Sequence, residues 1–367
     1  MRLIVIDEMS MIGRSMLRSI DLRLRELRPG SNEPFGGFNI VFLGDFGQLP
    51  PVMDKVMFEQ KNEGPPLSKE GRQSFLSINK AIILTRVERI QGNDDEQTYF
   101  REMLLRFRNG EVTCQDVQRL NERHHSFLSQ DEKNHFVDAT FLVSTKDEEN
   151  DYNRNKLQEN PNPLYVFEAV HSPPSAKKGT TEQAMGLRPC VSLKVDAKVM
   201  LRSNQWVAAG LTNGSMGTVH GFLFNPQETY ATKSLPVAVC VHFPGYRGPA
   251  WDPNHPKVVP IIPITNKWMH QTHFHSRTQI PLSLAHATTI HKSQGWTLER
   301  VKVDIGKNEM CSGISFVALS RAKSLKGIMI FPQKTTHITL ERIEKINAPK
   351  NQAKRKKIDA HMTKLKL

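Results

Sequence analysis

The sequence LIVIDEMSM at residues 3–11 decides the fold. Its first four residues are apolar and mostly β-branched, and the carboxylate pair Asp7 and Glu8 follows them directly. A short apolar run bounded by charge predicts a strand that is buried on both faces of a parallel sheet. Ligands of open α/β sheets bind beyond the carboxyl ends of the strands, so we expect this pair at a functional site. One carboxylate can hold a hydrated Mg²⁺ while its neighbour orients a water molecule.

A second apolar run, residues 40–43, is followed by the turn sequence GDFGQLPPV at 44–52. Glycine permits a tight turn, and the paired prolines stiffen the chain that leaves it. We therefore expect Gln48 at the same sheet edge as the carboxylate pair. Further buried strands are predicted at 81–84, 140–145, 301–305 and 327–331.

Two amphipathic helices are predicted, one over residues 16–27 and one over residues 97–110 with Gly110 as its C-cap. Arginines occupy the outer faces of the first helix. We expect all of them on a solvated surface, because no aromatic residues interleave them. These arginines are Arg14, Arg18, Arg23, Arg25 and Arg28.

The composition is that of a globular chain long enough for two or three domains, with 367 residues, of which 38% are hydrophobic and 24% charged. No apolar run approaches the roughly 20 residues of a membrane span and no secretory signal opens the chain, so we expect an intracellular protein without a membrane partner. The net charge of +13 favours nucleic acid as a partner, although anionic membranes and acidic proteins also fit it. The four cysteines have no Cys-x-x-Cys spacing, which argues against a zinc site or a disulfide framework.

The middle of the chain has the pattern of a small antiparallel barrel. Short strands are predicted at 193–201, 218–222, 237–241 and 258–262, while nine prolines from Pro226 to Pro281 exclude long helices. Residues 161–186 read as a surface excursion. Three nearby histidines could suggest a metal site, but we expect strand alternation to split them between faces. They are His270, His273 and His275. For the tryptophans at 206, 251 and 268, we expect core or turn packing rather than stacking on bases.

Two stretches near the C-terminus carry further chemistry. The first, LSLAHATTIHKSQGWTL at 282–298, combines small hydroxylated residues with one lysine at a helix start, which suits phosphate contact. The second, FVALSRA at 316–322, ends an apolar helix in a Ser-Arg pair that can place a guanidinium on a transferred phosphoryl group. The basic tetrad at 354–357 reads as a nuclear address or a nucleic-acid tail, with a disordered solvated tail as the alternative.

Together these stretches resemble motifs II, III, V and VI of superfamily 1B DNA helicases, most closely the PIF1 family and its transposon-borne helitron relatives. The resemblance runs from residue 3 to about residue 331, is weaker at 161–186, and departs from the family at Trp296. It implies an α/β fold with two RecA-like parallel-sheet lobes, the first incomplete, and a small SH3-like β-barrel inserted in the second. The implied order is a partial first lobe at 1–80, the second lobe at 81–204 and 284–336, the insert at 205–283, and a basic tail at 337–367.

The resemblance also implies an activity, that of an ATP-dependent 5′→3′ DNA helicase that uses ATP and Mg²⁺ and acts on single-stranded DNA and duplex junctions. In the matching roles, Asp7 coordinates Mg²⁺, Glu8 positions the attacking water and Gln48 senses the terminal phosphate. Arg89, which follows the run at 81–84, and Arg321 stabilise the transition state, and Arg321 also binds the nucleotide.

Further residues match the family's links between nucleotide and DNA. The two that would connect the sites, and touch the nucleotide, are Gln294 and Gly295. Those that would grip the strand are Thr289, His291, Lys292 and Ser293. The resemblance further implies a nuclear location, with mitochondria as a second one, and no stable protein partner is evident.

A phosphoryl-transfer site of this class also needs the phosphate cradle Gly-x-x-x-x-Gly-Lys-[Ser/Thr], and the sequence contains no such string. In the family this cradle precedes the carboxylate strand. We therefore expect a sequence truncated at its start, with an exposed apolar strand edge and negligible ATP hydrolysis by this chain alone. A non-catalytic nucleic-acid-binding remnant of a transposon-derived helicase stays open as the alternative. A metal nuclease using Asp7 and Glu8 is disfavoured, because it leaves Gln48 and Arg321 unexplained.

Overall fold

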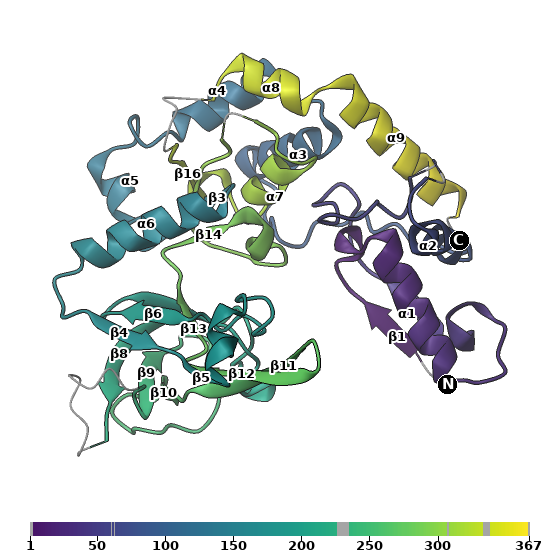
Figure 1. The fold of residues 1–367 in the computed structure, drawn as a ribbon. Coiled ribbons are helices and arrows are strands. Elements are labelled where there is room, and N and C mark those ends of the chain that lie inside the picture. Colours follow the sequence, from purple (N-terminus) through teal and green to yellow (C-terminus); the bar gives the residue numbers. More distant parts are fainter. Residues whose placement is uncertain are drawn as a thin grey trace. The chain divides into compact units, whose positions relative to one another are not determined.

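The computed structural model describes residues 3–59, 61, 63–225, 235–306, 308–332 and 338–365. The chain divides into two compact units. Unit 1 comprises Met1–Lys146 and Thr288–Leu367, and unit 2 comprises Asp147–Ala287. Figure 1 colours their helices and strands in chain order. No helix among the described residues is both long enough and apolar enough to span a bilayer.

The first sheet of unit 1 contains the predicted carboxylate strand. Strand β1 (Leu3–Ile6) pairs in parallel with β2 (Asn39–Phe42), with Leu3 opposite Asn39. Both strands are confirmed, but burial on both faces is wrong, because Leu3 and Val5 are more than half exposed. Helices α1 (Arg14–Glu26) and α2 (Pro66–Leu76) pack against each other in the same part of the chain. Only the face of β1 that holds Ile4 and Ile6 is therefore partly buried.

The arginines of α1 differ in part from the expectation of a solvated face, which is confirmed for Arg23, whose side chain is 79% exposed. Arg14 is fully buried, and its Nη1 donates a hydrogen bond to the Lys61 carbonyl at 2.9 Å. Arg18 and Arg25 pair with the carboxylate of Asp21, whose side chain is 1% exposed. The helical pattern identifies the outer face correctly. It does not reveal that the Lys61 carbonyl binds Arg14, or that the buried carboxylate of Asp21 binds Arg18 and Arg25.

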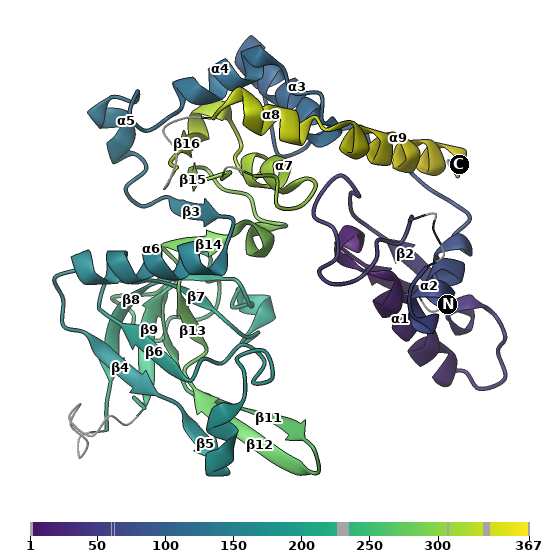
Figure 2. The ribbon, with the colours of Figure 1, turned by 45° about the horizontal axis from the view of Figure 1, so that its top comes forward.

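The second sheet of unit 1 has the order β14-β3-β15-β16. Parallel pairing joins β15 to β3 and to β16 (Figure 2). The residues of all three strands are buried. Its strands are β3 (Thr140–Val143), β14 (Ala287–Thr289), β15 (Val301–Val303) and β16 (Ile328–Ile330). Two parallel sheets in a mixed chain confirm the predicted α/β class.

Four more helices of unit 1 precede these strands or connect them in the chain. They are α3 (Asp95–Asn109), α4 (Cys114–Glu122), α5 (Gln130–Asn134) and α7 (Ile314–Leu319). Phe100 and Phe107 of α3 join one apolar cluster with α7 and with strand residues such as Val303. Gly110 caps α3 in the left-handed conformation at φ 72°, as its position predicted. The N-cap of α3, Asp94, accepts a hydrogen bond from the Gln97 backbone.

The strand predicted at 81–84 is wrong. Ile82 is 75% exposed and Leu84 is 87% exposed, and neither belongs to a strand. Ala81 forms a backbone hydrogen bond at 2.8 Å from its N–H to the Leu365 carbonyl. An apolar run predicts burial only where a neighbouring strand can pair with it, and within the described residues none does so here.

Unit 2 is helix α6 (Lys146–Glu159) followed by antiparallel strands. The sheets have the orders β10-β9-β8-β7-β13, β11-β12-β5 and β4-β6. The strands are β4 (Tyr165–Glu168), β5 (Val170–Ser172), β6 (Cys190–Leu193), β7 (Lys198–Leu201), β8 (Met216–Leu223), β9 (Ala238–His242), β10 (Val258–Ile261), β11 (Ile264–His270), β12 (His273–Gln279) and β13 (Leu282–Leu284). Antiparallel strands thus begin within the expected surface excursion, and residues 193–201 form a strand end, a turn and a second strand rather than one strand.

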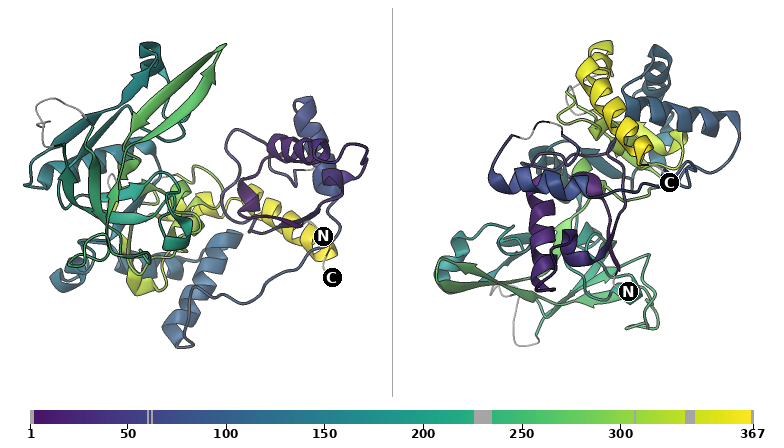
Figure 3. Two further views of the ribbon diagram at one scale, coloured as in Figure 1. Left: turned by 90° about the horizontal axis from the view of Figure 1, so that it is seen from below. Right: turned by 90° about the vertical axis from the view of Figure 1, so that its right-hand side faces the viewer.

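The β11–β12 hairpin, a long two-stranded ribbon in Figure 3, carries the three histidines. The expectation that alternation separates them is wrong, because the rings of His270 and His275 lie 5.4 Å apart. Trp268 packs in the core as predicted. Trp206 precedes a short 3-10 helix and its ring lies 6.5 Å from that of Tyr246, although Trp206 and Trp251 are both about half exposed. Within the described part of the chain, no group of three or more His, Cys, Asp or Glu side chains is arranged to hold a metal ion.

The C-terminal residues form α8 (Leu340–Ile346) and α9 (Pro349–Lys364) rather than a disordered tail. The basic tetrad lies within α9. Arg355 is buried, and its guanidinium donates to the Phe107 carbonyl and to Ser312 Oγ, both at 3.4 Å. Lys356 and Lys357 are exposed. A solvated tail is therefore wrong for Arg355 and right for these two lysines.

Candidate functional site

The carboxylate pair lies where β1 ends. Asp7 is exposed, and its Oδ1 accepts a hydrogen bond from the Glu8 backbone N–H at 2.8 Å. Glu8 is half-buried and adopts the left-handed conformation, with φ 53° and ψ 44°. This conformation is uncommon for residues other than glycine, asparagine and aspartate, and in other proteins such strain clusters at functional sites.

Glu8 contacts a residue that lies almost 300 positions later in the chain. Gln294 follows the short 3-10 helix Ile290–Ser293, and its Nε2 lies 2.5 Å from Glu8 Oε2 and 3.5 Å from Ser10 Oγ. Gly295 has φ +82°, and a Cβ built there would lie 3.6 Å from Glu8 Oε1. The structure therefore brings three predicted site residues together, namely Glu8, Gln294 and Gly295.

Two arginines lie in the same region. Arg321 follows α7 and is 2% exposed, and its Nε donates to the Val317 carbonyl at 2.9 Å. Arg89 donates from Nε to Thr297 Oγ1 and from Nη1 to the Ser320 carbonyl, both at 3.0 Å. Within the described residues neither guanidinium forms a salt bridge to a carboxylate. Both charges are held by neutral oxygens instead.

The charges of Glu8 and the two arginines influence one another. Burial, and then the charge of Arg89, lowers the pKa of Arg321 to about 10, while Glu8 opposes this shift. Burial likewise lowers the pKa of Arg89, and Glu8 again acts to raise it. At neutral pH both guanidiniums stay protonated. Two mutually repelling cations, of which Arg321 is buried and Arg89 half-buried, form an arrangement that an anion would stabilise.

Gln48 lies beside Ser10 rather than on Glu8. It faces a small cavity that Ser10, Ser312 and Arg355 also line, and its buried Oε1 has no hydrogen-bond partner within the described residues. Ser10 Oγ is also within reach of Gln294 Nε2. Gln48 thus shares a cavity with Ser10 but forms no hydrogen bond to the other predicted site residues within the described part of the chain.

The loop that carries Gln48 is anchored by an ion pair that sequence reasoning missed. Arg108 of α3 contacts Asp45 with two donors, at 2.8 Å from Nη2 and 3.0 Å from Nε, and Asp45 also accepts the Gly47 N–H. Burial opposes the charge of Arg108, but Asp45 outweighs it and raises the pKa of this arginine. Asp359 of α9 lies 3.4 Å from the same guanidinium. The residue types are visible in the sequence, but no spacing indicates that they meet.

The stretch predicted to grip a DNA strand is partly buried. Thr289 and Ser293 are buried, and Ser293 Oγ donates to the Ile290 carbonyl at 2.8 Å. His291 and Lys292 are half-buried. Burial lowers the pKa of His291, which favours its neutral form at physiological pH.

Asp7 fits the predicted contact to Mg²⁺. Its carboxylate is exposed at the strand end, and among the residues that the structure describes only its Oδ1 is engaged, by the Glu8 backbone N–H. Magnesium commonly binds through one or two carboxylates together with water and substrate phosphates, so it needs no cage of protein ligands.

Comparison with known proteins gives a consistent result. A family model described as PIF1-like helicase matches residues 1–118. The chain is 30% identical over 331 residues to the human ATP-dependent DNA helicase PIF1, covering 89% of this chain and 45% of that protein. It is 27% identical over 391 residues to the ATP-dependent DNA helicase RRM3 of Saccharomyces cerevisiae, covering 90% of this chain and 51% of that protein. The chain thus spans about half the length of the curated relatives it matches.

Solved structures agree with these matches. The crystal structure of Pif1 helicase from Candida albicans superposes with a TM-score of 0.72 at 25% identity, covering 98% of this chain and 77% of that one. A Bacteroides Pif1 helicase in complex with ADP-AlF3 and ssDNA has a TM-score of 0.64 at 26% identity, covering 93% of this chain and 72% of that one. The resemblance inferred from the motifs is confirmed: residues 1–118 match the PIF1-like helicase model, and the chain as a whole is similar to PIF1 helicases.

Proposed function

We propose that this chain is the part of an ATP-dependent DNA helicase that couples ATP hydrolysis to 5′→3′ movement along single-stranded DNA and to duplex unwinding. One observation carries the proposal. Glu8 meets Gln294 and is coupled by charge to Arg89 and Arg321, which have no carboxylate partner among the described residues. A triphosphate is the anion that suits such a set. The names of the curated relatives, ATP-dependent DNA helicases, support it.

In this proposal each group has a distinct role in phosphoryl transfer. Asp7 holds Mg²⁺, which when bound neutralises phosphate charge. Glu8 orients the attacking water, and the hydrogen bond from Gln294 fixes one of its oxygens. Arg89 and Arg321 release their hydrogen bonds to carbonyl and hydroxyl oxygens and donate to the oxygens of the transferred phosphoryl group instead. The charge of the transition state is spread over these oxygens.

The DNA contacts are proposed for the 3-10 helix that precedes Gln294. His291 and Lys292 keep part of their side chains at the surface, so we assign them the strand itself. Thr289 and Ser293 are buried and would position these two side chains. Gln294 contacts Glu8 and directly follows this helix. A movement of Glu8 during nucleotide binding would therefore be passed by Gln294 to the residues that contact the DNA strand.

The test compares the 367-residue chain with a version extended upstream through a P-loop. We expect negligible ATP hydrolysis from the chain alone and DNA-stimulated hydrolysis from the extended version. In the extended version, Glu8→Gln should lower the hydrolysis rate by about 100-fold or more while nucleotide binding persists. Glu26→Gln, an exposed carboxylate of α1, is the matched control. Robust hydrolysis by the chain alone would contradict the expected inactivity of this chain, and an active Glu8→Gln enzyme would contradict the proposed role of Glu8.

Polarity is tested with partial duplexes that carry a single-stranded tail at either end. We expect the extended version to displace strands from 5′-tailed duplexes only. The alternative is a non-catalytic nucleic-acid-binding remnant. It predicts binding to both substrates and hydrolysis of ATP by neither version. A fluorescent fusion of the protein tests the proposed nuclear location.

A further inference from the structure

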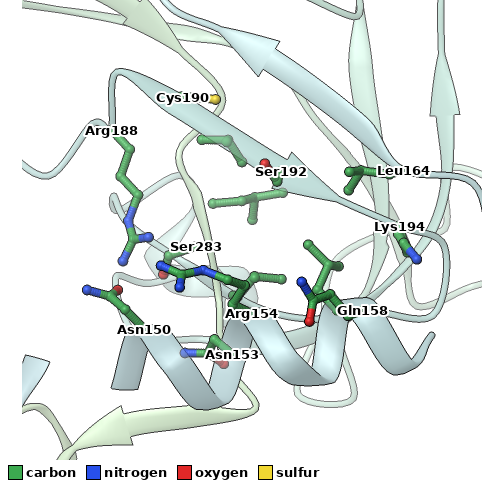
Figure 4. Close-up of a pocket in the computed structure, with 14 residues that line it drawn as sticks. Asn150, Asn153, Arg154, Gln158, Leu164, Arg188, Cys190, Ser192, Lys194 and Ser283 are labelled. Carbon is green, nitrogen blue, oxygen red and sulfur yellow. The ribbon is translucent and has the colours of Figure 1, made fainter. Parts of the chain in front are cut away.

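Unit 2 contains a pocket that the proposed motor chemistry does not use. It has a volume of about 540 Å³, within the range of small-molecule sites, and lies between helix α6 and strands β6 and β13 (Figure 4). All fourteen residues that line it belong to unit 2. The pocket is therefore formed entirely within one compact unit.

The lining of this pocket is positively charged. Arg154, Arg188 and Lys194 contribute three cations, and the lining contains no aspartate or glutamate. Lys194 donates to the Asn160 carbonyl at 2.5 Å, and Arg154 has a weak, exposed contact to Asp151 at 3.4 Å. Figure 4 shows the guanidiniums of Arg154 and Arg188 pointing into the same part of the pocket. An anion would be attracted there.

Arg188 is the least satisfied of these cations. It is half-buried, and no hydrogen bond or salt bridge to it occurs within the described residues. Another cation lies near it, since burial and then the charge of Arg188 lower the pKa of Arg202, while Glu149 acts to raise that pKa. A half-buried guanidinium that faces another cation costs free energy unless an anion binds. The phosphate group, which pairs with two guanidinium donors at once, matches this geometry.

The rest of the lining is suited to a flat, partly apolar body. Leu157, Val191 and Leu282 form a buried apolar wall. Polar groups that can pair with the edge of a ring come from Gln158 and Ser283. A further amide, Asn153, is not available, because its side chain donates to and accepts from the backbone of Ala287 at 2.9 Å.

We propose that this pocket binds a nucleoside phosphate, with the phosphate between Arg188 and Arg154 and the base against Leu157 beside Gln158. The site is separate from the ATP site proposed above, and its existence does not depend on ATP hydrolysis. Two sources can supply the same chemistry. One is a free mononucleotide, and the other is the phosphorylated end of a DNA strand.

The experiment measures AMP binding to the 367-residue chain by isothermal titration calorimetry, with adenosine and inorganic phosphate as the comparison probes. We expect AMP to bind at least tenfold more tightly than either probe. Arg188→Gln and Arg154→Gln should each weaken AMP binding by about tenfold or more, since each removes a charged hydrogen bond. Arg154 is exposed on α6, so its variant tests the site without disturbing the core.

Two further variants separate this pocket from other effects. Lys267→Gln removes the same charge from an exposed position of β11 outside the lining, and AMP affinity should stay within twofold. Arg321→Gln alters the proposed ATP site, and AMP binding should persist. Displacement of AMP by a 5′-phosphorylated oligonucleotide would identify a strand end as the source, and its failure to displace AMP would identify a free nucleotide. The proposal is overturned if AMP does not bind, if adenosine or phosphate binds equally well, or if Arg188→Gln has no effect.

Discussion

Replacing Asp21 by asparagine should loosen the region around α1 more than any other loss of one charge on that helix. The buried carboxylate accepts four hydrogen bonds, from Arg18 Nη1 and the Phe35 N–H at 2.6 Å and from Arg25 Nε and Ser74 Oγ at 2.9 Å. These donors come from α1, from the segment that leads into β2, and from α2. One side chain therefore ties together three segments next to the carboxylate strand.

The size of the effect follows from this network. A hydrogen bond to a charged group contributes about 1.5–3 kcal/mol. Asparagine keeps two acceptor bonds but loses the charge that Arg18 and Arg25 require, and their side chains are 21% and 31% exposed, so water replaces part of the loss. We expect the substitution to lower the free energy of opening of α1 by about 3 kcal/mol. This corresponds to roughly hundredfold faster amide hydrogen exchange in that helix. Exchange is the appropriate assay because a chain with two units need not unfold in one step.

Glu26→Gln is the matched control, because it removes an exposed carboxylate paired with Arg23 on the same helix and should change exchange little. Burial raises the pKa of Asp21, but its hydrogen bonds outweigh this and hold the pKa below the ordinary value. Its stabilisation is therefore complete above that ordinary pKa of about 3.9 and is lost as the pH falls through the lower folded value. Equal exchange in Asp21→Asn and Glu26→Gln at pH 7 would refute the reasoning.

Two further predictions concern packing and reactivity. In Gly71→Ala, the new Cβ would lie 1.9 Å from the Arg14 carbonyl oxygen, so α1 and α2 must separate. This costs about 1–3 kcal/mol, outweighs the gain in helix propensity of about 1 kcal/mol, and should speed exchange in both helices; unchanged exchange would contradict it. Burial and Glu309 raise the pKa of Cys311 to about 11, so at pH 8 iodoacetamide should modify the exposed Cys114 and spare Cys311, as mass spectrometry would show; equal labelling would contradict this.

The sequence predicted the elements whose own residues determine them. Strands β1, β15 and β16 are apolar runs that find parallel partners, and Gly110 ends α3 because only a residue at ease with positive φ fits there. The run at 81–84 has the same composition but no partner among the described residues. The wrong prediction at 81–84 shows that an apolar composition indicates a tendency to be buried but does not identify a neighbouring strand that could bury it.

The candidate site likewise contains residues that the sequence predicted and contacts that it did not predict. Glu8 was predicted from the end of its strand and Gln294 from the resemblance to the helicase motifs, and the fold brings Glu8 Oε2 and Gln294 Nε2 to 2.5 Å. The contact between Asp45 and Arg108 was not predicted, because the separation of an ion pair across 63 positions leaves no periodic signal. Buried polar partners such as Asp21 are likewise chosen by tertiary packing rather than by local pattern.

The left-handed backbone of Glu8 has a consequence for laboratory evolution of this protein. A glutamate in this conformation costs of order 1 kcal/mol, which glycine or asparagine would recover. A selection that rewards heat resistance alone should therefore discard this carboxylate early. Libraries screened for thermal survival and libraries screened for turnover should diverge at this codon before they diverge elsewhere in β1 and its turn.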